Sequence, residues 1–275
     1  MINFNGVLTE KAACILTVQN RAFRYGDALF ETLKVKGTAV CYLEKHYFRL
    51  MASMRMLRME IPMFLTVEYF EEEILKTVAE NVLKDARVRL TVFRNDGGLY
   101  KPENKGISYV VEVFPLNEER KHDYQMALYK DFYIHAGLLS TLKTTNRITN
   151  VLASIYADEN GYDNCVLLNE HKRVVEAING NIFIVKDKGI FTPPLSEGCV
   201  KGVMRAVLIS ACEKRTDYRI QEAALSPFDI QKADEIFITN AVIGIQPVTH
   251  YRKRFFNTDV STKLFEEVIS SGKGS

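Results

Sequence analysis

The sequence predicts an α+β protein built from two domains. Strand and helix patterns alternate over about the first 115 residues, a charged segment without periodicity follows, and a second series of strands and helices occupies the rest. We therefore expect a smaller first domain over residues 1–115, a linker over residues 116–124 and a larger second domain over residues 125–275. A chain of 275 residues is long enough for two ordinary domains.

The spacing of apolar residues assigns the elements of the first domain. Apolar side chains at three- and four-residue steps indicate helices, and period-two alternation indicates strands. Thr66 is the expected cap of the second helix, whose apolar face should extend to Val82. The predicted elements are a strand at 2–6, a hairpin at 33–42 that turns at 36–38, helices at 43–58 and 66–84, and strands at 86–95 and 106–114.

The second domain follows from the same patterns. Asn146 is the expected cap of a helix that Gly161 ends, and Ser226 with Asp229 predicts a capping box at the start of a short helix. The predicted strands are 125–133, 164–168, 173–176, 182–185, one near 218–224 and 235–239, and the longer helices are 147–159, 202–214 and 260–270. The expected buried face of helix 147–159 consists of Ile148, Val151, Leu152, Ile155 and Tyr156.

Charge and composition narrow the possible functions. The chain has 36 Lys and Arg against 34 Asp and Glu, and a net charge of +2 predicts neither a nucleic-acid nor a membrane surface. No apolar run is long enough to span a membrane, and the first ten residues do not resemble a signal peptide, so we expect a cytoplasmic protein. The five cysteines, Cys14 among them, and the five histidines are scattered, so neither a metal site nor a disulfide is expected.

Lys143 is the first candidate for chemistry. It lies in "STLKTTNRITN" among small hydroxyl residues and amides, immediately before a predicted helix. Most lysines are solvated surface charges. A lysine on a segment that a buried helix holds in place could instead present its amine from a rigid mount.

Three later segments could contribute to a site. Glu176 ends a predicted strand, where a glutamate is usually exposed. Gly198 and Gly202 bracket the start of an apolar helix, which either forms an anion site or is simply a buried helix with a tight entry. Thr239 and Asn240 end a buried strand and could bind a phosphate or turn the chain.

Six motifs in order resemble one enzyme family over most of the chain. The motifs are "RYGDALFETL" (24–33), "HYFRL" (46–50), "LKTTNR" (142–147), "NCVLLNEHKRVVEAINGNIF" (164–183), "GCVKGVMR" (198–205) and "EIFITNAVIGIQPV" (235–248). Together they resemble the class IV aminotransferases. These are fold-type IV pyridoxal-phosphate enzymes, which include branched-chain and D-amino-acid aminotransferases and 4-amino-4-deoxychorismate lyase. The resemblance implies that pyridoxal 5'-phosphate lies between two domains.

The resemblance also implies a role for each site residue. Lys143 matches the lysine that forms the Schiff base with the cofactor, because a primary amine makes a reversible imine. Glu176 matches the carboxylate that keeps the pyridine nitrogen protonated. Arg49 matches the arginine on the cofactor phosphate. The same phosphate is expected to meet the amides of Val203 and Met204, with Thr239 and Asn240 opposite, and Asn181 is expected to brace the loop below Glu176.

The reaction is less well determined than the family. The motifs resemble the lyase most, yet Leu99 stands where the lyases usually have an arginine, and Tyr100 stands in for their tyrosine. An amino-acid transaminase is the alternative, and a non-catalytic binding module is a remote one. The resemblance implies a homodimer. The substrate candidates are Tyr25, Arg94, Tyr100 and Arg147, with Arg24 as a further arginine near the first motif.

Overall fold

The computed structural model describes residues 1–12, 16–187, 189–213 and 218–270, and Cys14 lies outside them. The chain forms two compact units. Among the described residues, the first contains Met1–Asn117 and Lys143–Asn146, and the second contains Glu118–Leu142 and Arg147–Ser270. The sequence-based division had placed residues 143–146 in the second domain, whereas the structure groups them with the first unit.

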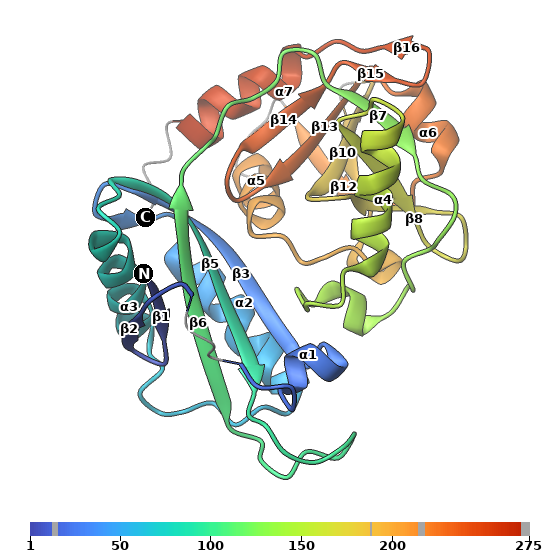
Figure 1. The fold of residues 1–275 in the computed structure, drawn as a ribbon. Coiled ribbons are helices and arrows are strands. Elements are labelled where there is room, and N and C mark those ends of the chain that lie inside the picture. Colours follow the sequence, from blue (N-terminus) through green and yellow to red (C-terminus); the bar gives the residue numbers. More distant parts are fainter. Residues whose placement is uncertain (13–15, 188, 214–217, 271–275) are drawn as a thin grey trace. The chain divides into compact units, whose positions relative to one another are not determined.

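The first unit is a six-stranded antiparallel sheet with helices packed on it (Figure 1). The strand order is β2-β1-β6-β5-β3-β4, with α2 against β3 and α3 against β1 and β6. The strands are β1 (Ile2–Phe4), β2 (Val7–Thr9), β3 (Ala28–Lys36), β4 (Ala39–Val40), β5 (Asp85–Arg94) and β6 (Ile107–Pro115), and the helices are α1 (Arg21–Tyr25), α2 (Leu43–Met56) and α3 (Val67–Glu80).

Sequence periodicity explains most of this unit. Thr66 caps α3 by accepting a hydrogen bond from the backbone N–H of Tyr69, as predicted. The expected helix was too long, however, because α3 ends at Glu80 and Val82 adopts a positive φ of 54° with its side chain 91% exposed. The predicted hairpin is confirmed, although β3 begins at Ala28, several residues before the predicted start.

The second unit contains two five-stranded sheets, ordered β12-β11-β10-β13-β14 and β16-β15-β7-β8-β9. The strands are β7 (Gln125–Leu128), β8 (Asn164–Leu168), β9 (Val174–Ala177), β10 (Asn181–Lys186), β11 (Gly189–Thr192), β12 (Arg219–Glu222), β13 (Glu235–Asn240), β14 (Gly244–Val248), β15 (His250–Tyr251) and β16 (Arg254–Phe255). The helices are η1 (Leu138–Thr141), α4 (Ile148–Glu159), η2 (Leu195–Glu197), α5 (Val203–Glu213), α6 (Pro227–Lys232), α7 (Asp259–Leu264) and the π-helical η3 (Phe265–Ser270).

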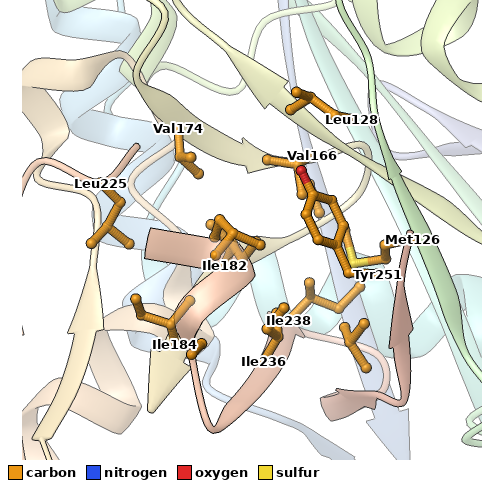
Figure 2. Close-up of a cluster of buried hydrophobic side chains, with 14 of the residues drawn as sticks. Met126, Leu128, Val166, Val174, Ile182, Ile184, Leu225, Ile236, Ile238 and Tyr251 are labelled. Carbon is orange, nitrogen blue, oxygen red and sulfur yellow. The ribbon is translucent and has the colours of Figure 1, made fainter. Parts of the chain in front are cut away.

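The two sheets of the second unit pack face to face over an apolar core. Figure 2 shows side chains of both sheets gathered in this cluster, among them Val166 of β8 and Ile182 of β10. The alternate residues of the same strands point outward: Cys165 and Leu167 pack with α4, and Phe183 packs with α5. Because both faces of these strands are covered, their sequences are nearly continuous apolar runs.

Several expectations for the second unit are wrong in detail. The predicted strand 125–133 ends at Leu128, where its pairing with β8 stops. The N-cap of α4 is Arg147, without a side-chain hydrogen bond, because the Asn146 side chain instead donates to Gly26 O at 3.0 Å. The predicted capping box of Ser226 and Asp229 is confirmed.

Helix α4 buries only part of the expected face, because Leu152 and Tyr156 pack against the sheet but the other three expected residues do not. Ala153 and Ala157 are buried, whereas Ile148, Val151 and Ile155 are 68%, 50% and 48% exposed. Small alanine side chains allow the helix to lie close to the sheet, and the three exposed side chains then lie on the far side.

Candidate functional site

Lys143 lies on an extended segment at the edge of β3 in the first unit. The backbone N–H of Phe30 donates to Lys143 O at 2.9 Å, and the N–H of Thr145 donates to Ala28 O at 3.1 Å. Strand β4 pairs only with the last two residues of β3, so residues 143–145 occupy the edge that β4 leaves open. The rigid mount of Lys143 is therefore a strand edge rather than the helix that the sequence indicated.

The amine of Lys143 lies over an aromatic ring. Its Nζ is 4.4 Å from the ring centroid of Phe30, and the guanidinium carbon of Arg89 is 4.0 Å from the same centroid. The face of an aromatic ring attracts a cation, and the attraction is stronger where water is partly excluded. Lys143 is partly buried, so its amine is held at a defined position rather than spread through solvent.

Arg49 and His46 converge on Glu31, which is 1% exposed. Both residues lie on α2. Arg49 Nε donates to Glu31 Oε1 at 2.8 Å, and a second guanidinium nitrogen of Arg49 contacts Oε2. His46 Nδ1 lies 2.7 Å from the same Oε2.

The pKa values of this cluster describe its charge. Burial raises the pKa of Glu31, but Arg49 and the His46 hydrogen bond outweigh burial and lower that pKa to about 2. Burial lowers the pKa of His46, the hydrogen bond and charge of Glu31 oppose this, and the positive charges of Arg49 and Lys143 add to the lowering, so the pKa lies below its ordinary value. A neutral His46 then donates from Nδ1 to Glu31, and its buried Nε2 has no hydrogen-bond partner.

Sequence reasoning gave no role to Glu31 or His46, although both stood in the quoted motifs. Glu31 alternates with Leu29 and Leu33 on the buried face of β3, where a carboxylate needs a partner. A charged residue in an apolar register was therefore the available signal. The guanidinium predicted for a phosphate is paired with Glu31, so a phosphate at Arg49 would share it with that carboxylate.

Glu176 is a buried residue of β9 in the second unit. Its side chain is 6% exposed, so the solvent exposure usual for a glutamate at a strand end does not apply. Oε2 accepts a hydrogen bond from the backbone N–H of Val200 at 2.9 Å. Arg147 Nη1 lies 3.9 Å from Oε1, which is the outer limit of an ion pair. A buried carboxylate with a cation at this distance can serve as a fixed negative charge.

The entry to α5 is built around Gly202 and Asn181. Asn181 Nδ2 donates to Val200 O at 2.9 Å, so Asn181 holds the loop whose Val200 amide binds Glu176. A Cβ at Gly202 would lie 1.9 Å from Asn181 Oδ1, so a larger residue does not fit there. Directly after this glycine, Val203 and Met204 begin the helix, where backbone N–H groups have no acceptor within the helix.

Thr239 and Asn240 differ in what their side chains do. Thr239 pairs directly with Asn181 across two strands, which places both side chains on the same face of the sheet. Its Oγ1 is buried and has no hydrogen-bond partner. Asn240 Oδ1 accepts from the backbone N–H groups of Val242 and Ile243 at 3.0 and 2.9 Å. Asn240 therefore turns the chain, and Thr239 offers the unsatisfied hydroxyl.

The substrate candidates of the first unit are mostly committed to structural contacts. Arg94 pairs with Asp27 and donates to the carbonyls of Leu57 and Arg58. Arg24 Nε donates to Val18 O at 3.0 Å. The ring centroids of Tyr25 and Tyr100 are 5.4 Å apart, and Tyr100 is 87% exposed.

Arg147, the candidate of the second unit, donates through Nη2 to Leu142 O at 2.7 Å, besides its approach to Glu176.

Within the described ranges, no group of three or more metal-ligating side chains is gathered, and no helix has the length and apolarity needed to cross a membrane. None of the four described cysteines forms a disulfide. Burial raises the pKa of the Cys199 thiol to about 12, because Glu176 adds to the desolvation.

Comparison with known proteins places the chain in a family. Residues 28–251 match the family "Amino-transferase class IV". The chain belongs to the class IV aminotransferases. A putative branched-chain-amino-acid aminotransferase of Methanocaldococcus jannaschii is 31% identical, with 97% of this chain and 94% of the relative covered. The aminodeoxychorismate lyase of Vibrio harveyi is 29% identical over 84% of this chain and 85% of its own length.

A solved structure agrees with this assignment. The 4-amino-4-deoxychorismate lyase of Pseudomonas aeruginosa has a TM-score of 0.87 and 27% identity, covering 98% of this chain and 99% of that one. The fold is that of the fold-type IV enzymes, as predicted. Class IV aminotransferases are pyridoxal-phosphate-dependent transaminases or lyases, and this family member is an enzyme of that kind.

The residues present fit pyridoxal phosphate chemically. The cofactor needs a primary amine for attachment, a carboxylate for its ring nitrogen and hydrogen-bond donors for its phosphate. Lys143 carries a primary amine, and Glu176 is a buried carboxylate. The unpartnered hydroxyl of Thr239 and the first-turn amides of α5 are hydrogen-bond donors of the kind that a phosphate accepts from.

Proposed function

We propose that the protein is a 4-amino-4-deoxychorismate lyase, which eliminates pyruvate from its substrate and leaves p-aminobenzoate. The observation that supports this choice is the end-to-end correspondence with the P. aeruginosa lyase in both fold and length. In this proposal the product serves folate synthesis, and the enzyme works in the cytoplasm.

The proposal gives each cluster a task. Bound pyridoxal phosphate supplies an electron sink for the bond that breaks. Lys143 is the attachment point of the cofactor, and its amine moves the proton from the substrate carbon. Glu176 holds a proton on the pyridine nitrogen. Arg49, Thr239 and the amides of Val203 and Met204 bind the phosphate, and Asn181 keeps the Val200 loop in place.

A transaminase acting on an amino acid, of the branched-chain or D-amino-acid type, is the second candidate. The relative from M. jannaschii favours it, because its 31% identity extends over nearly the whole chain. Both reactions begin by removing a proton beside the amine, so the residues proposed above serve either one. The two candidates differ in their products.

One experiment separates these candidates. The holoenzyme is incubated with 4-amino-4-deoxychorismate, and separately with L- or D-amino acids plus 2-oxoglutarate. We expect p-aminobenzoate and pyruvate from the first mixture and no glutamate from the second. Glutamate without p-aminobenzoate would assign the protein to the transaminases. If the protein binds the cofactor but forms neither product, it is a non-catalytic binding module.

Lys143→Ala tests whether Lys143 is the residue to which the cofactor is attached. It should abolish both the visible absorption of the bound cofactor and turnover, while the thermal unfolding profile stays that of a folded protein. Borohydride reduction of the wild type should attach the cofactor mass to the peptide that contains Lys143. The mass on another lysine would contradict the assignment.

We further propose that the protein is a homodimer. The support on this chain is the outer face of α4, where Ile148, Val151 and Ile155 are exposed at helical spacing. Exposed apolar groups that share one helix face mark an interaction surface more often than isolated apolar residues do.

A further inference from the structure

Residues 97–100 form a loop whose backbone is held while its side chains are exposed. The Leu99 side chain is 72% exposed and that of Tyr100 is 87% exposed. Gly98 has a φ of +74°, and a Cβ there would lie 2.2 Å from Lys101 O. The loop therefore has a specific tight path, which its own apolar contacts do not explain.

Arg21 is the residue that holds this path. It is the one buried residue of the five-residue helix α1, with its side chain 4% exposed. Its Nη1 lies 3.1 Å from Gly97 O, 3.5 Å from Gly98 O and 2.5 Å from Leu99 O. Its Nη2 lies 3.4 Å from Tyr100 O. One planar guanidinium thus reaches four consecutive carbonyl oxygens, as its fixed array of donors allows.

Asp27 fixes Arg21 in turn. Arg21 Nε donates to Asp27 Oδ2 at 2.9 Å, and Arg94 Nε donates to the same oxygen at 2.8 Å. Burial raises the pKa of Asp27, but the hydrogen bonds and charges of Arg94 and Arg21 lower it below its ordinary value. A carboxylate shared by two arginines stays ionised, so it can orient the Arg21 guanidinium toward the loop.

A second clasp holds the start of the loop. Asp96 accepts hydrogen bonds from Asn20 Nδ2 at 3.1 Å and from Thr17 Oγ1 at 2.8 Å. Asn20 is also the N-cap of α1, where its side chain accepts from the N–H groups of Ala22 and Phe23. The helix that carries Arg21 and the loop it holds are therefore fixed to each other at two places.

We infer that Arg21 is a positioning residue that sets the path of residues 97–100 and, through that path, the affinity for the amino substrate. This inference rests on the proposed function and on Tyr100, a substrate candidate from the sequence, being a substrate contact in it. Arg21 itself does not touch the substrate in this scheme, because its N–H groups donate to Asp27 and to the loop carbonyls. Its loss should therefore affect substrate binding far more than the chemical step.

Two substitutions test this role in the holoenzyme. Arg21→Lys keeps a cation beside Asp27 but cannot span four carbonyls with one ammonium, and Arg21→Ala removes both functions. In both variants, hydrogen–deuterium exchange should rise about tenfold or more over residues 95–106 and stay unchanged over β3 and β5. The exposed Arg55→Ala on α2 is the control and should leave exchange and kinetics unchanged.

The kinetic readout separates positioning from a general structural role. We expect KM for the amino substrate to rise about tenfold, kcat to stay within about threefold and the cofactor absorption to be unchanged in Arg21→Lys. Unchanged exchange in a folded Arg21→Lys, or faster exchange with an unchanged KM, would overturn the inference. A wild type without turnover would refute the proposed function instead, and the exchange measurement alone would then decide whether Arg21 holds the loop.

Discussion

Glu31 shows how strongly one buried carboxylate can depend on its partners. It lies in the apolar register of β3, and both Arg49 and His46 of α2 reach it. Removing one partner of a buried ion pair leaves an uncompensated charge, which typically costs 3–5 kcal/mol. The helix and the strand are therefore joined by a polar contact inside an otherwise apolar face.

Replacing Glu31 with glutamine should destabilise the protein in a pH-dependent way. The folded-state pKa of about 2 lies below the ordinary value of 4.5, so the charged form contributes its full stabilisation above pH 4.5. At about 1.4 kcal/mol for each pKa unit, the loss in Glu31→Gln should be about 3 kcal/mol at pH 7. In the wild type this contribution falls as pH drops from about 4.5 to 2, so the difference between the proteins should shrink over that window. Urea unfolding at pH 7 and pH 3 measures both differences, and equal values would contradict the pairing.

Glu176→Gln tests a charge rather than a hydrogen bond. The amide can still accept from the Val200 N–H, but it carries no negative charge for a pyridinium. We expect the variant to bind pyridoxal phosphate and to lose about a hundredfold or more in turnover, the scale seen for one preorganised electrostatic group. Single-turnover kinetics should show it, and a rate within about threefold of wild type, under 1 kcal/mol, would remove Glu176 from the chemistry.

At the scale of elements, sequence patterns predicted the strands and helices whose own residues show a clear apolar run or period. Strands β8, β10 and β13 could be predicted because their sequences are apolar runs. The runs are nearly continuous because both faces of each strand are covered. The face of α4 was predicted only in part: Leu152 and Tyr156 do pack on the sheet, but a count of apolar residues favours isoleucine over the alanines that are buried there. Contacts distant in sequence, such as Lys143 beside Phe30, leave no periodic signal, so the mount of Lys143 was missed even though its motif was recognised.

The start of α5 leaves no room for a side chain at Gly202. We expect Gly202→Ala to displace the Asn181 side chain and thereby disturb the Val200 loop. Overpacking of this kind usually costs about 1–3 kcal/mol. Affinity for pyridoxal phosphate, measured by titration of the apo-protein, should fall by about tenfold or more. Gly137→Ala is the control, because its Cβ would lie 3.3 Å from the His135 side chain, and equal affinities in the two variants would contradict the role of this helix start.

At the scale of the whole molecule, the outer face of α4 tests the proposed homodimer. Ile155→Glu places a charge on the exposed apolar face without touching the buried alanines. We expect analytical ultracentrifugation to show a dimer for the wild type and a shift toward monomer for the variant at micromolar concentration. Ser154→Glu, exposed on the same helix, is the matched control and should stay dimeric. A wild type that sediments as a monomer would refute the proposal.

The placement of residues 143–146 in the first unit has a consequence for synthesis on the ribosome. The edge of β3 at Ala28–Phe30 has no β4 partner and is covered only when these later residues arrive. A nascent chain that ends at Asn117 therefore exposes unpaired backbone groups, which are a template for aggregation. The first unit cannot be completed before translation has passed Asn146. A gene fragment that ends at Asn117 therefore does not encode the whole first unit.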